Sequence, residues 1–187
     1  NLGLPSGTIW ASQNVGAAKP SDFGLYFQWG DTKGYSKNQI GFGKEQKKFA
    51  LDDYKWNPSG DGETFTKYTT PGATLELEDD AAHVNMGGDW HIPTPTQFQE
   101  LIDNTITSWI ALDDGVNGMI CISKKDTSKS IFFPAAGYAW NGSIEFSYSD
   151  GNVWSSMLNS CFENYSDNLM FYQEHVYVDY YSRCDGF

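Results

Sequence analysis

The chain has 187 residues, and 24 acidic against 12 basic side chains give it a formal net charge of −12 at pH 7. An acidic chain of this kind is repelled by nucleic-acid backbones and anionic membranes, so neither is expected as a partner. No apolar run approaches the ~18 residues that a membrane-spanning helix needs, so direct membrane insertion is not expected. The length suits a single domain over 1–187, and the many glycines and aromatics predict a loop-rich α+β or mostly β fold.

The first third of the chain carries weak patterns. A Pro5–Gly7 turn precedes Thr8–Ala11, which we interpret as the first strand. Residues 22–30 carry aromatic side chains around a glycine, and their periodicity fits either a strand or a short helix. From residue 31 to 70 the sequence is polar and glycine-rich, which predicts a long loop.

Two helices are predicted in the middle of the chain. Residues 75–86 can form a short acidic helix, and Thr94–Gln97 is a capping box with Pro95 at the first helical position. The apolar stripe that follows extends the second helix to about Asn104. Strands are then expected near 118–123 and 129–133, and Asn141–Gly142 predicts a tight turn.

The last 34 residues, 154–187, form the stretch around which we expect the rest of the chain to be organised. Leu169 and Phe171, and then Val176 and Val178, recur at a period of two, which predicts two half-buried strands. Gln173–Glu174 separates them as the turn of a hairpin. The residues between these apolar positions are rich in Tyr, Ser, Asn and Asp, the mixture that antibody-like binding sites use. The same composition also suits an ordinary aromatic strand edge, and composition alone leaves both interpretations open.

No motif predicts an enzyme. The acid pairs lack the spacing of a calcium loop, so a solvated acidic surface is favoured over a calcium site. The three histidines lack zinc-ligand spacing, and no nucleophile elbow or phosphate-binding loop occurs. Cys161 or Cys184 with His175 is the only candidate nucleophile and base, and an exposed hairpin would not activate a thiol. We therefore expect no catalytic residue, no metal and no cofactor, and leave open whether Cys161 and Cys184 form a disulfide.

Several stretches resemble a known family, namely LGLPSGTIWASQNVGA (2–17), YFQWGDTK (26–33), LEDDAAHVNMGGDWHIPTPTQFQELID (77–103), SIFFPAAGY (130–138) and WSS with the NLMF, HVYVDYYSR and GF segments of the tail. They resemble the Fibrobacter succinogenes major paralogous domain, a secreted or surface module common in Bacteroidetes. The resemblance implies a C-type-lectin-like α+β fold with one or two short helices, a mostly antiparallel sheet and neighbouring termini. It also implies an extracellular, cell-surface or phage-borne protein whose export signal precedes this chain.

Members of this family include the variable proteins of diversity-generating retroelements, in which adenines of a template are randomised. The adenine-containing codons yield Asn, Tyr, Ser, Asp, His, Cys and Phe, and the tail resembles that output. The resemblance implies a scaffold that includes Trp154, Leu169, Phe171 and Arg183, within a variable ligand-binding region over 154–187. The expected ligand-contacting residues are Ser160, Cys161, Phe162, Asn164, Tyr165, Asp167, His175, Tyr177, Asp179, Tyr180, Ser182, Cys184 and Asp185.

The resemblance thus predicts a non-enzymatic, receptor- or adhesin-type domain that binds an unknown protein or surface glycoconjugate through a sequence-diversified surface. The tripeptides with which C-type lectins hold calcium and sugar are missing, since Trp140–Asn141 is followed by Gly142. The alternative is a surface or fimbrial adhesin or structural module of fixed sequence that binds glycans or proteins.

Overall fold

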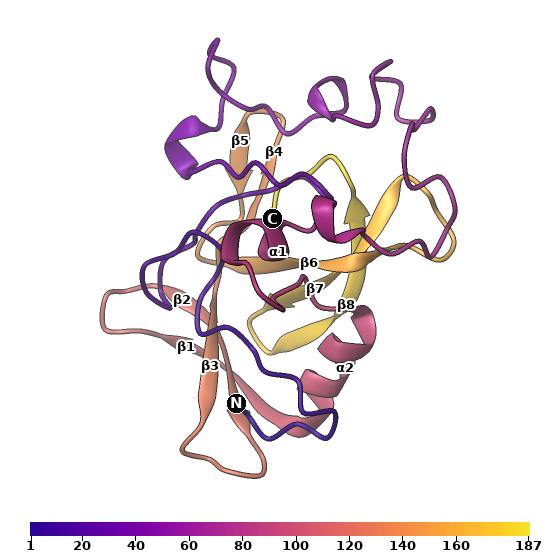
Figure 1. The fold of residues 1–187 in the computed structure, drawn as a ribbon. Helices are drawn as coiled ribbons and strands as arrows, with labels where there is room; N and C mark the ends of the chain where they lie inside the picture. Colours follow the sequence, from indigo (N-terminus) through magenta and orange to yellow (C-terminus); the bar gives the residue numbers. More distant parts are fainter.

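The computed structural model describes residues 1–187 and contains three antiparallel sheets and two helices (Figure 1). The helices are α1 (Ala81–Met86) and α2 (Pro95–Asn104). The strands are β1 (Thr105–Ala111), β2 (Asn117–Ser123), β3 (Ser130–Pro134), β4 (Tyr138–Trp140), β5 (Ser143–Glu145), β6 (Asp150–Leu158), β7 (Tyr165–Tyr172) and β8 (His175–Ser182). The mostly antiparallel architecture with two helices agrees with the predicted α+β class.

Both helices begin where side chains cap them. Thr94 Oγ1 accepts a hydrogen bond from the Gln97 amide at 3.2 Å, and the Gln97 side chain accepts one from the Thr94 amide at 2.9 Å. This reciprocal pair confirms the predicted capping box. Asp80 caps α1 by accepting from the His83 amide, so the helix expected over 75–86 is shorter and begins after the cap. A turn of 3-10 helix, Leu77–Asp79, precedes it.

The tail forms the sheet β6–β7–β8, which lies at the centre of Figure 1. β7 and β8 pair from Tyr172↔His175 to Tyr165↔Ser182, around the turn predicted at Gln173–Glu174. Leu169 and Phe171 are 1% exposed and pack with Phe98 and Leu101 of α2. Burial of this apolar face against the helix fixes the register of the hairpin.

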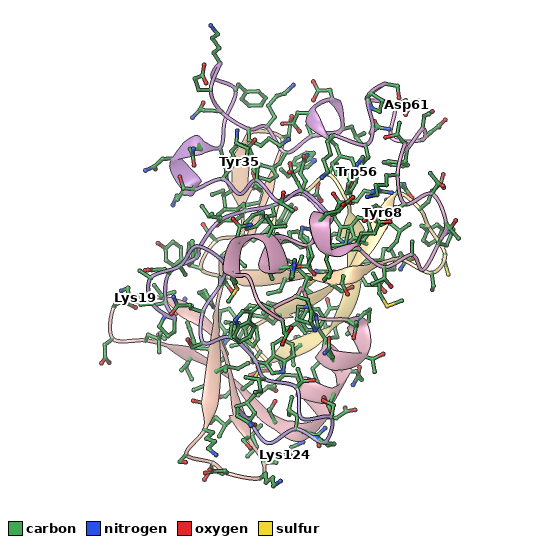
Figure 2. The ribbon with its side chains drawn as sticks, viewed as in Figure 1. Lys19, Tyr35, Trp56, Asp61, Tyr68 and Lys124 are labelled. Carbon is green, nitrogen blue, oxygen red and sulfur yellow. The ribbon has the colours of Figure 1, made fainter.

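The long polar segment has little regular structure, yet it contributes to the core. Tyr54, Trp56 and Phe65 are buried beside Trp154 and Leu158 of the tail sheet. Trp56 and the half-buried Tyr68 lie next to each other, with ring centroids 5.0 Å apart, above one end of the tail sheet (Figure 2). The segment predicted as a loop therefore covers that end of the sheet with aromatic side chains.

Three expectations for the outer parts of the fold are wrong. Residues 8–11 form no strand, because Trp10 packs on Phe98 and Phe133 without a neighbouring strand to pair with. Residues 22–30 are neither strand nor helix. They form the isolated bridge Tyr26↔Tyr35 and backbone hydrogen bonds with Arg183 and Phe187. The termini are not neighbours: in Figure 1 the N-terminus lies near the β1–β3 sheet, whereas the C-terminus lies near β4.

Candidate ligand-binding surface

The register of the hairpin divides the predicted ligand residues between two faces. The inner face carries the rungs Asp167↔Tyr180 and Tyr165↔Ser182, together with the buried Leu169. The outer face carries Asn168↔Asp179, Met170↔Tyr177 and Tyr172↔His175. Because neighbouring residues of a strand point to opposite sides, the expected single display face is wrong.

Each face is covered at one end and open at the other. On the inner face α2 covers Leu169 and Phe171, which leaves Tyr165 and Tyr180 beyond the helix. On the outer face Ser166 and Asn168 are 0% exposed, whereas His175 and Tyr177 at the turn are exposed. Exposed residues therefore occur at opposite ends of the hairpin, on opposite faces.

A first cluster, here called the loop patch, consists of Phe162, Tyr165 and Tyr180. The Phe162 and Tyr180 side chains are 49% and 45% exposed, and the three ring centroids lie 5.5 to 6.1 Å apart. Such edge and tilted contacts hold aromatic rings in place while their outer surfaces stay accessible. The loop patch offers a cluster of mutually inclined, partly exposed aromatic rings to a partner.

Asn159 fixes the backbone of the loop that carries Phe162. Its Oδ1 accepts hydrogen bonds from the amides of Cys161 at 2.9 Å and Phe162 at 3.1 Å. Its Nδ2 donates to Asp167 Oδ1 at 2.8 Å. Ser160 and Cys161 are exposed on this loop, and Asn164 is half-buried. The loop conformation is therefore set by a buried asparagine and not by the side chains that it displays.

A second cluster, here called the hairpin patch, consists of Tyr172, His175 and Tyr177 on the outer face. The Tyr172 ring centroid lies 4.8 Å from that of His175 and 6.3 Å from that of Tyr177. Tyr177 is 38% exposed, and desolvation, with the Tyr172 hydroxyl as a second cause, raises its pKa to about 12. Tyr177 is therefore a neutral hydrogen-bonding group at neutral pH.

Two predicted ligand residues are buried, which corrects the sequence interpretation. Cys184 is 4% exposed and Asp185 is 5% exposed, so neither is accessible to a partner. The chain after β8 turns inward, and Cys184 joins the core cluster beside Trp154. Burial raises the pKa of the Cys184 thiol to about 12 and that of the Asp185 carboxyl to about 7. The alternation that predicted exposure stops where the strand ends.

The structure does not bring the cysteines and histidine together. Cys121, Cys161 and Cys184 are all free, so the disulfide left open from the sequence is not formed. His175 begins β8, whereas Cys184 follows its end, and a rise of about 3.3 Å per residue places them more than roughly 20 Å apart. Cys161 precedes β7, whose first residue, Tyr165, pairs with Ser182 at the end of β8 opposite His175. Neither candidate nucleophile is therefore assembled with His175.

Arg183, expected to be part of the scaffold, anchors the tail. It is 1% exposed and donates hydrogen bonds to the Tyr54 hydroxyl at 2.8 Å and to the carbonyls of Lys67, Tyr68 and Glu163 at 2.9 to 3.0 Å. Its guanidinium lies 4.5 Å from the centroid of Phe65. One side chain thus ties the end of β8 to the long segment and to the displayed loop.

Sequence reasoning missed two aromatic residues from the β4–β5 region. Tyr138 lies 5.4 Å from Tyr181 of the tail and 6.0 Å from Phe146, which is 56% exposed. The turn predicted at Asn141–Gly142 connects β4 and β5, which pair Tyr138 with Glu145. Nothing in the local pattern predicted its contact with the tail, because that contact joins residues about forty positions apart.

The acidic residues just before α1 do not form an open metal site. Glu76, Glu78 and Asp79 converge, and the Lys67 ammonium lies 2.6, 3.4 and 2.6 Å from their oxygens. An ammonium ion therefore occupies the position that a metal ion would need. A mostly apolar cavity of about 200 Å³ lies elsewhere, between Trp10, Met86 and Trp90, and no predicted ligand residue lines it.

No family model, curated protein or solved structure matches this chain. None of its helices has the length and apolar character needed to span a membrane.

Proposed function

We propose that this chain is a ligand-binding domain with a C-type-lectin-like fold that displays a diversified surface, as the variable proteins of diversity-generating retroelements do. The observation that carries the proposal is the alternation of fixed and displayed positions in the tail. Leu169, Phe171 and Arg183 are buried, while Phe162, Tyr177 and Tyr180 are exposed beside them. In such a tail the exposed side chains can be exchanged without disturbing the packing of the buried ones.

The binding mechanism in this proposal is preorganisation. Asn159 holds the loop, the α2 contact holds the inner face, and Arg183 holds the end of β8, so little backbone entropy is lost when a ligand binds. A few aromatic anchors would carry most of the affinity, as at other protein interfaces. The expected ligand is a protein or a surface glycoconjugate, met outside the cell, on its surface or on a phage.

The test is the DNA around the gene. Diversification requires a second, near-identical copy of the tail-coding sequence and a reverse-transcriptase gene close by, and the two copies should differ at adenines of the template. Finding both features, with differences at the codons of Phe162, Tyr177 and Tyr180, supports the proposal. A locus with neither feature contradicts diversification and favours an adhesin or assembly module of fixed sequence.

A further inference from the structure

A line of aromatic side chains runs along the outer face of the hairpin and continues onto the β4–β5 region. Tyr177 and Tyr181 lie four residues apart on β8 and therefore on the same face. Tyr138 extends the line from Tyr181, with ring centroids 5.4 Å apart, and the exposed Phe146 stacks on Tyr138 at 6.0 Å. Segments distant in sequence thus form one aromatic strip.

Carboxylates accompany this strip. Asp179 lies between Tyr177 and Tyr181 on the same face of β8, and Asp150 belongs to the same face of β6, opposite Tyr172. Burial first, and then the charges of Asp185, Glu145 and Asp150, raise the pKa of Tyr138. The negative charges are therefore close enough to act on the aromatic hydroxyls.

None of the ion pairs in the structure involves Asp150, Asp179 or Asp185. Lys129 is the last lysine of the chain, and the one later cation, Arg183, is 1% exposed and bonded to the long segment. Lys19 is paired with Asp114, and Lys19 and Lys124 both lie away from the tail sheet in Figure 2. The strip therefore presents uncompensated negative charge next to aromatic faces.

Asp185 adds a buried carboxyl group without a cationic partner to this region. Its side chain is 95% buried, and its carboxylate receives only a weak hydrogen bond from the Cys184 thiol at 3.8 Å. Its charge is among the causes that raise the pKa of Tyr138 and the pKa of Tyr181. A buried carboxylate usually has a cation or several donors as partners, and this one has neither within the chain.

We propose that this strip binds an arginine side chain on the surface of a partner protein. The proposal rests on the ligand-binding function above and specifies the chemistry of the ligand. A guanidinium has donors only, fits carboxylates in a bidentate manner and stacks on aromatic rings, so it matches both components of the strip. An ammonium would satisfy the carboxylates but uses the flat aromatic surface less well.

The test uses the whole protein with a blocked Gly-Arg-Gly peptide, monitored by two-dimensional amide NMR. The matched probe is the same peptide with citrulline, which keeps the shape of arginine and removes its charge. We expect the arginine peptide to shift the resonances of residues 177–181 and 138, with a dissociation constant on the order of millimolar and at least about tenfold below that for citrulline. Raising the salt concentration should weaken binding.

Variants test whether the outer face carries the site. D179N on the outer face should weaken arginine binding several-fold, whereas D113N, which changes an exposed carboxylate in the turn after β1, should leave it unchanged. Equal shifts with both peptides, an equal effect of the two variants, or no shifts at about 20 mM arginine peptide would overturn the proposal. If the arginine peptide does not bind but a template repeat is found at the locus, the arginine proposal fails and the diversification proposal is still supported. If arginine binding depends on Asp179 but no template repeat is found, the protein has an arginine site of fixed sequence and the diversification proposal fails.

Discussion

Replacing Asp185 by Asn should stabilise the protein at neutral and alkaline pH. The carboxyl is buried without a cationic partner, and desolvation raises its pKa to about 7 from 3.8. The folded state therefore holds this proton more tightly than the unfolded state, and stability falls as the pH rises from about 4 to about 7. At about 1.4 kcal/mol for each tenfold difference in proton affinity, the full cost of ionising the folded protein is about 4 kcal/mol.

Asn keeps the shape of the protonated acid, so D185N should be close to wild type in stability near pH 4. Its advantage should grow through pH 7 and then level off at about 2 to 4 kcal/mol. The assay is urea unfolding followed by tryptophan fluorescence at a series of pH values. D113N, which changes an exposed carboxylate in the turn after β1, serves as the control. A wild-type to D185N difference that is constant with pH, or that reverses at high pH, would refute the reasoning.

Three further predictions concern the scaffold and the displayed side chains. Arg183→Met should lower the free energy of unfolding by about 3–5 kcal/mol in chemical denaturation, because four hydrogen bonds are lost and buried acceptors stay unpaired; a loss below about 1 kcal/mol would contradict the anchoring role. The triple change of Phe162, Tyr177 and Tyr180 to Ala should move the melting temperature by only a few degrees in calorimetry, since all three are exposed, and a large drop would place them in the core. Thr94→Ala should cost about 1 kcal/mol by uncapping α2, whereas Thr94→Ser should cost little; equal losses would exclude the capping role.

The sequence predicted the features that depend on local chemistry. The capping box over Thr94–Gln97 gave the start of α2, and the alternation around Leu169 and Phe171 gave the hairpin with its turn at Gln173–Glu174. Strand β1 was missed although Thr105–Ala111 is rich in β-branched residues, because the helix pattern runs directly into it without a turn. Local sequence signals therefore located helices and strands. A boundary that lacks turn residues, such as the one between α2 and β1, was not predicted.

The site was harder to predict because it depends on long-range packing. Composition identified the tail, but which of its side chains α2 and the long segment would bury depends on packing between distant parts of the chain. The burial of Cys184 and Asp185 depends on the chain turning inward beside Trp154, and the contribution of Tyr138 depends on a neighbouring hairpin. The periodicity of apolar residues within the tail cannot predict these contacts, because they involve other parts of the chain.

Sequencing this gene from sibling strains tests the central claim most directly. If a fixed backbone displays exchangeable side chains, substitutions should concentrate at exposed tail positions such as Phe162, Tyr177 and Tyr180, and Leu169, Phe171 and Arg183 should stay constant. An unchanging tail, or substitutions spread evenly over buried and exposed positions, would contradict the account.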